Sequence, residues 1–241
     1  MTLGIYDEPP PSQLLLPHPP ISLSVFLVIE EAMIVAWTLL RVQPRTGFDL
    51  LTAPEDEITH EFYETLYDKV FKDRLVAGFN NDLFAAIVRE GKLRSYDGGS
   101  LDKMPDLLIR LIGPREVCFL SQDWLCVECK PVDSDHTAGQ HYCDRGVKRF
   151  VQGEYAWAMT SALMVGYARP GYTILPKLVD ALAARAKEIP TLAGPRPCSS
   201  CVATTISEAV HISLHKRTFK YVGTEQMAPD ISIRHLWLRR D

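Results

Sequence analysis

Short apolar runs bounded by turn residues mark the centre of this chain. Leu107–Ile112 and Trp124–Cys129 are rich in Leu, Ile, Val, Cys and Trp, and they are separated by Gly113-Pro114 and Ser121-Gln122-Asp123. Runs of this length between turn signals are typical of buried strands. The pattern predicts that the two segments are neighbouring central strands of one sheet.

A helical pattern precedes these strands. Thr52-Ala53-Pro54-Glu55 has the form of a capping box with proline in the first turn, which predicts a helix start. We expect this helix to run to about residue 72. Its buried stripe has apolar side chains at helical spacing, namely Ile58, Phe62, Leu66 and Val70.

Further elements follow from the same patterns. Residues 80–90, 146–167 and 174–187 are predicted to be helices, the second with a clear 3.6-residue apolar period. Residues 92–96, 211–222 and 231–238 are predicted to be strands, and residues 131–145 and 190–200 to be loops. Strands interspersed with helices predict an α/β protein with a mixed central sheet flanked by helices.

The N-terminal region combines a proline-rich stretch with an apolar one. Residues 7–20 are dense in proline, so residues 1–20 are expected to form a flexible arm. Residues 21–42 are strongly apolar, but Glu30 and Glu31 interrupt their centre, where two carboxylates would be costly inside a membrane. We therefore expect a buried helix or a helix–strand pair in a cytoplasmic protein without membrane contact. Residues 21–241 are predicted to form one domain, with 21–50 packed on it.

Composition adds a modest electrostatic signal. The chain has 241 residues and a formal net charge of -4, with the acidic excess in residues 1–130 and a basic excess in residues 131–241. An acidic half could bind cations and a basic half could bind phosphate, but such asymmetry is also common by accident and adds little alone. Six cysteines in a chain of this length do not indicate a disulfide-rich scaffold.

Chemistry-bearing residues fall at the ends of the two central strands. Pro105-Asp106 opens the first strand, and Glu128-Cys129-Lys130 closes the second. Because side chains i and i+2 of a strand share a face, Glu128 and Lys130 should project together. Two carboxylates on rigid elements make an oxygen site suited to Mg²⁺, and a neighbouring lysine can orient water or offset phosphate charge.

These residues resemble the motif of the PD-(D/E)xK nuclease superfamily. The resemblance implies a restriction-endonuclease-like fold and Mg²⁺-dependent hydrolysis of DNA phosphodiester bonds, with Mn²⁺ able to substitute. Asp106, Glu128 and the Cys129 carbonyl would bind the metal, and Lys130 would position or activate water. The expected setting is defence against foreign DNA, ahead of DNA repair. The same motif also fits a strand start and a strand end that carry ordinary surface charges.

In this superfamily a helix before the sheet often adds one more acidic residue. Glu57, near the start of the predicted helix and beside Ile58, is the expected contributor, with Glu61 second. The alternative is that both belong to a solvated acidic face of the helix.

Four residues are candidates for contact with DNA. Arg149 and Gln152 are neighbours on the predicted helix surface, three positions apart. Gln152 and Tyr155 approximate a Gln-x-x-x-Tyr motif of exonuclease-like members, but the spacing is one residue shorter. His215 and Arg217 belong to a row of donors on a strand, which could bind phosphates or a partner chain. An ordinary polar helix face and a charged edge strand are the alternatives.

Two rival functions stay open. One is a non-catalytic nucleic-acid-binding or assembly module that keeps the fold, working as a homo-oligomer or with an activating partner protein. The other is a zinc-stabilised interaction protein built on Cys126-x-x-Cys129 and Cys198-x-x-Cys201. Residues i and i+3 of a strand lie on opposite faces, which disfavours zinc at the first pair.

Overall fold

A seven-stranded mixed sheet forms the centre of the protein. The computed structural model describes residues 16–100, 102–112, 117, 119–198 and 210–241. The strand order is β1-β2-β3-β4-β7-β6-β5, in which β3, β4 and β7 run parallel and the other neighbouring pairs are antiparallel. The strands are β1 (Phe84–Arg89), β2 (Leu107–Leu111), β3 (Leu125–Val132), β4 (Ser161–Ala168), β5 (Thr191–Pro197), β6 (His211–His215) and β7 (Ile231–Arg239).

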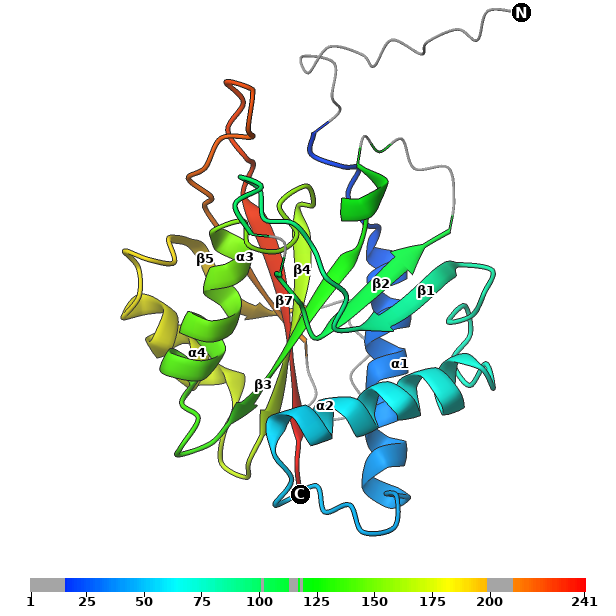
Figure 1. The fold of residues 1–241 in the computed structure, drawn as a ribbon. Coiled ribbons are helices and arrows are strands. Elements are labelled where there is room, and N and C mark those ends of the chain that lie inside the picture. The colour runs from blue at the N-terminus through cyan, green and yellow to red at the C-terminus, as the bar shows by residue number, and fades with distance from the viewer. Residues whose placement is uncertain (1–15, 101, 113–116, 118, 199–209) are drawn as a thin grey trace, which may run out of the picture.

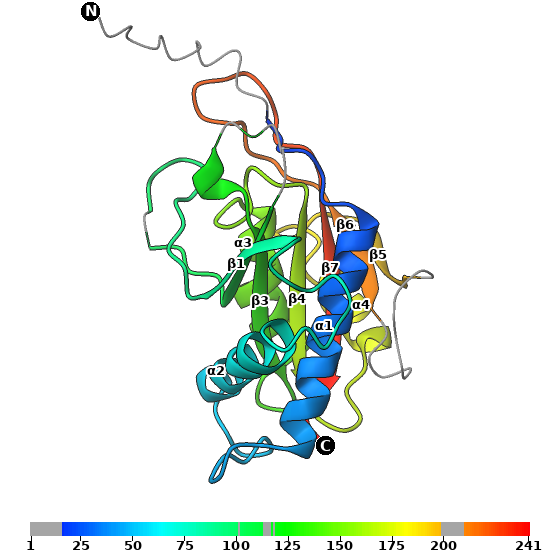
Figure 2. The ribbon, with the colours of Figure 1, turned by 90° about the vertical axis from the view of Figure 1, so that its right-hand side faces the viewer.

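Helices cover the sheet on both sides. α1 and α2 lie on one side and α3 and α4 on the other, as the two views show (Figures 1 and 2). This arrangement confirms an α/β protein with a mixed sheet between helices. The helical segments are α1 (Leu23–Val42), α2 (Glu55–Glu64), η2 (Thr65–Phe71), η3 (Leu120–Gln122), η4 (Ala138–Val147), α3 (Lys148–Val151) and α4 (Ile174–Ala183).

The predicted helix after the capping box is confirmed, as are the two central strands. α2 continues without a break into the π-helical segment η2, and the predicted stripe from Ile58 to Val70 is fully buried. β2 and β3 pair antiparallel, with Leu107 opposite Val127 and Ile109 opposite Leu125. The final predicted strand is also present as β7.

α1 is a core helix in this structure. Its length and hydropathy would also suit a membrane span, but half of the stretch is buried inside the protein. Glu30, at its centre, is fully buried and forms a two-armed ion pair with Arg234 of β7, with one N–O distance of 2.9 Å. Trp37 of the same helix donates a hydrogen bond to the Arg239 carbonyl, at 2.7 Å.

Two predicted helices are wrong. Residues 80–90 contain β1 instead. Residues 146–167 contain only the short helix α3, and β4 then occupies Ser161–Ala168. Every residue of β4 is buried, so its sequence has no alternation of apolar and polar positions that would distinguish a strand from a buried helix.

Several boundaries also differ from expectation. Residues 92–96 contain only one isolated bridge, Leu93 to Lys103, and residues 138–145 of the predicted polar loop belong to η4. β5 occupies most of the predicted loop 190–200, and β6 ends at His215 rather than near residue 222. Residues 1–15 of the predicted arm lie outside the described residues. Within residues 16–20 the expectation of a flexible arm is wrong. His18 is buried, and its backbone N–H donates a hydrogen bond to the Ala158 carbonyl at 2.8 Å.

Candidate functional site

The candidate site lies where β2 and β3 part. β3 pairs with β2 only as far as Val127, and from Glu128 onward its ladder partner is β4 alone. Asp106, directly before β2, accepts a hydrogen bond from the Cys129 N–H through Oδ2, at 2.6 Å. The carboxylate therefore replaces a strand carbonyl as acceptor, and the opening between the strands begins at an acidic side chain.

Lys130 stands at the centre of a group of carboxylates. Its Nζ lies 2.6 Å from Glu55 Oε1, 3.1 Å from Glu128 Oε1 and 3.5 Å from Asp106 Oδ2, and it donates to the Cys129 carbonyl at 2.8 Å. Burial alone would lower the pKa of Lys130, but the three carboxylates, Glu128 foremost, outweigh it and raise that pKa. The side chain is therefore an ammonium ion at neutral pH.

Glu128 is the most deeply buried acid of the group, with 1% of its side chain exposed. Burial, reinforced by the nearby Asp106 carboxylate, raises the pKa of Glu128 to about 8. Its Oε1 forms ion pairs with the Lys130 ammonium and the Arg149 guanidinium, each at 3.1 Å. Its Oε2 is buried without a hydrogen-bond partner. A buried carboxylate oxygen without a partner is unfavourable in the free protein, and a cation would satisfy it.

Asp106 is the second buried acid. Burial raises its pKa, and the neighbouring Glu55 carboxylate acts in the same direction, against the opposing effects of Lys130 and the Cys129 N–H. Asp106 Oδ2 lies 3.5 Å and Glu128 Oε1 lies 3.1 Å from the same Lys130 Nζ, so the two oxygens are no farther apart than these distances added together. The pair that sequence analysis assigned to one metal is thus brought together.

Arg149 connects the acidic group to the helical side of the site. Its NH1 lies 3.1 Å from Glu128 Oε1 and donates to the Tyr155 hydroxyl at 2.5 Å. That hydroxyl in turn donates to the Met104 carbonyl, at 3.0 Å. Sequence analysis noted Tyr155 only as part of an approximate Gln-x-x-x-Tyr motif and did not predict its contact with Arg149.

The local sequence explains how these groups converge. Glu128 and Lys130 are two positions apart on β3, which puts both on one face of the strand. Glu55 is the first residue of α2 and Arg149 belongs to α3, so two helices supply the remaining groups. Gly146 allows close approach, because a Cβ there would lie 2.5 Å from Met164 and 3.7 Å from the Lys130 side chain.

The donor set fits a hard divalent cation. Carboxylate and carbonyl oxygens are the ligands that Mg²⁺ prefers, and Asp106, Glu128 and the Cys129 carbonyl offer them within one group. The buried and unpartnered Glu128 Oε2 is the observation that favours such an ion. In the metal-free state the Lys130 ammonium partly compensates the negative charge of these groups.

Glu55, rather than Glu57, is the residue of α2 that reaches this site. Glu57 is 42% exposed and lies 3.9 Å from Arg45, and Glu61 is bound by the same arginine at 2.7 Å. Successive helical residues are turned by about 100°, so Glu57 points about 200° away from Glu55. The assignment of Glu57 is corrected by this geometry. Glu55 was recognised in the sequence, but only as part of the capping box.

A second group of metal-capable side chains lies farther along α2. Ligand atoms of His60, Glu61 and Glu64 all lie within 4.8 Å of one another. His60 already contacts Glu64 at 3.3 Å, and Glu61 is held by Arg45. Groups of this kind on a helix face are common without a metal, so we assign no function to this one.

Two of the expected DNA-binding residues are buried. His215 is fully buried on β6, where its Nε2 meets the Ser213 hydroxyl at 2.6 Å and its Nδ1 the Thr191 hydroxyl at 3.2 Å. Arg217 is 1% exposed, and its guanidinium donates to four backbone carbonyls. Neither is available to a phosphate, because both side chains are buried and already hydrogen-bonded within the protein. Gln152 is exposed at the end of α3.

The cysteine pairs do not form a zinc site within the described residues. Cys126 and Cys129 are free and buried, on β3, where burial raises the pKa of Cys126 to about 12 and that of Cys129 as well. Metal-binding thiolates require a lowered pKa instead. Cys198 is disulfide-bonded, and Cys201 and Cys118 lie outside the described residues.

Comparison of the chain with models of protein families, with curated proteins and with solved structures gives no match.

Proposed function

We propose that this chain is a Mg²⁺-dependent nuclease that hydrolyses phosphodiester bonds of DNA. The observation that carries the proposal is the convergence of Asp106, Glu128 and Lys130 on one point, with a buried Glu128 oxygen left without a partner. Two carboxylates and an ammonium of this kind supply the parts that metal-assisted phosphodiester hydrolysis requires.

In this mechanism Asp106, Glu128 and the Cys129 carbonyl would hold the metal. When bound, the cation supplies stabilisation of the charge that develops on the phosphate and lowers the pKa of a coordinated water. Lys130 remains protonated because the surrounding carboxylates raise its pKa. It therefore orients the attacking water or a phosphate oxygen by donation and does not act as the base. Glu55, beside the ammonium and 31% exposed, could accept the proton of that water.

Two neighbouring helices support a restriction-endonuclease-like arrangement. The resemblance implies an acidic contribution from a helix before the sheet, and Glu55 of α2 meets that expectation. It also implies polar groups from the helix after the E-x-K strand, and Arg149 of α3 lies beside Glu128. By analogy with that superfamily, we propose defence against foreign DNA as the biological setting, ahead of DNA repair.

Cleavage assays test the proposal. Supercoiled plasmid and single-stranded DNA are incubated with the protein in Mg²⁺, in Mn²⁺ and in excess chelator. Nicking or degradation that needs the metal and is lost in Glu128→Gln and Lys130→Ala would support a nuclease. Glu57→Gln is the matched control, because it removes an equivalent charge from the same helix away from the site. Activity that survives in Glu128→Gln would reveal a contaminating nuclease.

The burial of His215 and Arg217 favours one alternative. Without them, the described residues offer fewer basic groups for DNA than the sequence indicated, which suits a non-catalytic assembly module. In that function Lys130 and its carboxylates would be a structural ion cluster. Absence of cleavage under all metal conditions, together with stable self-association or capture of a partner chain, would favour this alternative.

A further inference from the structure

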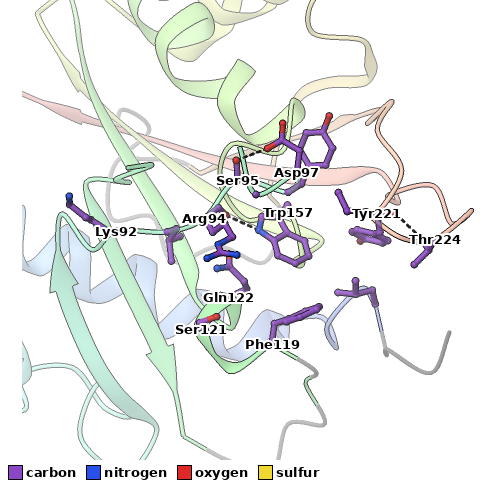
Figure 3. A pocket seen from close by; sticks show the side chains of 15 residues that line it. Lys92, Arg94, Ser95, Asp97, Phe119, Ser121, Gln122, Trp157, Tyr221 and Thr224 are labelled. Atoms are coloured by element: carbon purple, nitrogen blue, oxygen red, sulfur yellow. Dashed lines mark hydrogen bonds between the residues drawn. The ribbon is translucent and has the colours of Figure 1, made fainter. Parts of the chain in front are cut away.

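A cavity of about 660 Å³ is lined in part by Trp157, two residues after Tyr155 of the candidate site. Its volume falls in the range of ligand-binding pockets, about 300–1,000 Å³. Figure 3 shows that its walls come from separate parts of the chain, which contribute Arg94, Phe119, Gln122, Trp157 and Tyr221. None of these residues takes part in the acidic group around Lys130.

Aromatic rings dominate one side of this cavity. Trp157 lies between Phe119, with ring centroids 5.4 Å apart, and Tyr221, at 6.2 Å. Tyr96 also lines the cavity and is stacked on Phe219 at 4.3 Å. Trp157 is held in place by its ring N–H, which donates to the Arg94 carbonyl at 2.9 Å. The cavity therefore offers fixed ring surfaces against which a planar group can stack.

Charged and polar groups complete the lining, among them Asp97, which accepts a hydrogen bond from the Ser95 hydroxyl at 2.7 Å. Lys92 and Arg94 are exposed at the cavity, and Lys92 is paired with Asp102. The Arg94 guanidinium forms no ion pair with any described side chain. The buried Gln122 adds an amide group of the kind that hydrogen-bonds the edge of a base. Aromatic faces beside cationic side chains are the combination with which proteins bind single-stranded nucleic acid.

One loop connects the cavity with the candidate site. Tyr155 binds Arg149 at the acidic group, and Trp157, two residues later, forms a wall of the cavity. Ala156 between them has a φ of 49°, in the left-handed region that a residue with a side chain rarely adopts. Strained backbone of this kind is found preferentially at functional sites, where the surrounding structure maintains it. The loop thus presents two aromatic side chains, separated by one residue, to the acidic group and to the cavity.

We propose that the cavity binds an unstacked base of a single-stranded nucleic acid segment whose backbone passes the Asp106–Glu128–Lys130 group. The inference rests on the proposed nuclease function and adds its substrate class. The base stacks on Tyr96 or Trp157, Arg94 pairs with an adjoining phosphate, and Gln122 contacts the base edge. The enzyme would then act on strands whose bases can leave the duplex stack, such as single-stranded or frayed DNA.

Binding in the absence of metal tests the inference separately from cleavage. A fluorescein-labelled oligothymidylate of about ten nucleotides, within the range of known site sizes, is titrated with protein in excess chelator and followed by anisotropy. Tyr96→Ala should weaken binding roughly tenfold, which corresponds to about 1.4 kcal/mol. Arg94→Ala should also weaken binding of the oligonucleotide. Tyr96→Phe keeps the ring and should bind it as tightly as wild type. Lys187→Ala, an exposed charge that does not line the cavity, is the matched control.

A second measurement identifies the base that enters the cavity. A single abasic position is moved along the oligonucleotide, and one position should reproduce the loss caused by Tyr96→Ala. At that position the two changes should not add, because both remove the same stacking contact. Thermal unfolding of each variant shows whether the fold is intact.

The outcomes separate the two proposals. If wild-type protein binds no oligonucleotide, or if Arg94→Ala and Lys187→Ala weaken binding equally, the cavity inference is overturned. If metal-dependent cleavage occurs while Tyr96→Ala and Arg94→Ala bind like wild type, the cavity is part of the aromatic core only, and the nuclease proposal stands. If binding depends on the cavity and no metal supports cleavage, the nucleic-acid site stands and the nuclease proposal fails.

Discussion

The Lys130 ammonium lies 2.6 Å from Glu55 Oε1, and this ion pair joins the first residue of α2 to the middle of β3. The two residues are 75 positions apart in the chain. Because Glu55 is 31% exposed while Lys130 is 9% exposed, the pair leads from the buried acidic group to the surface. Glu55 and the 36% exposed Arg149 are therefore the groups of the site that solvent reaches most readily.

The first prediction compares two acids of one helix. Glu55→Gln should lower the rate of metal-dependent cleavage at least tenfold, since it removes a group that neighbours Lys130 and could accept a proton. Glu57→Gln should leave the rate near that of wild type, because its carboxylate faces Arg45 instead. Single-turnover cleavage of plasmid measures both. Equal losses in the two variants would show that the acidic helix acts only through its overall charge.

The second prediction concerns the stability cost of Glu128. Its pKa is about 8 in the folded protein, against an ordinary value of 4.5, so its ionisation destabilises the metal-free fold as the pH rises from 4.5 to 8. Near pH 8 the free energy of unfolding of Glu128→Gln should therefore exceed that of wild type by on the order of 1 kcal/mol or more. At pH 4.5 the difference should be small. Urea unfolding in chelator at both pH values measures the difference. A gain of the same size at both would contradict this assignment.

The third prediction distinguishes two replacements of Asp106. Asp106→Ala leaves the buried Cys129 N–H without an acceptor, which should cost about 1–3 kcal/mol of folding stability. Asp106→Asn keeps an oxygen at that position and should be more stable than the alanine variant. Both should lose cleavage, because neither offers a carboxylate to the metal. Chemical unfolding combined with the plasmid assay tests this, and equal stabilities would show that another acceptor replaces Asp106.

The fourth prediction concerns acid stability. Burial lowers the pKa of His215 to about 4, and burial with the nearby His215 lowers that of His235. Since the unfolded chain takes up these protons at ordinary histidine pKa values, near 6.5, stability is complete above that pH and is lost as the pH falls toward 4. The slope of unfolding free energy against pH between 6.5 and 4.5 should become smaller in His215→Asn. His60→Asn, at a half-exposed position of α2, is the control variant, and a slope unchanged in His215→Asn would contradict the prediction.

Sequence patterns were sufficient where an element has a distinct boundary or two different faces. β2 and β3 were predicted because turn residues bound their apolar runs, and α2 because its polar and apolar faces alternate at helical spacing. β4 was missed because all of its residues are buried between neighbouring strands and helices. A fully buried strand carries no periodic signal, and only its pairing with β3 and β7 defines it.

The candidate site divides in the same way. Glu128 and Lys130 belong to one strand, so their common face follows from the two-residue period. Glu55 and Glu57 both lie in the first turn of α2, and the choice between them depends on how that helix is turned toward β3. Local sequence does not contain that rotation. The burial of His215 and Arg217 likewise depends on elements distant in the chain, which cover β6 and the residues that follow it.

The ion pair between Glu30 and Arg234 has a consequence for synthesis of the protein. The two residues are separated by 204 positions, and α1 buries its apolar surface against strands that include β7, near the other end of the described chain. At roughly 5–20 residues per second, a ribosome needs about 10–40 seconds to add the intervening segment. During that interval α1 has no β7 to pack against, and its Glu30 carboxylate lacks the Arg234 guanidinium with which it pairs in the folded protein. The nascent chain therefore passes through a period of exposure in which chaperones that shield apolar segments should determine the yield of folded protein.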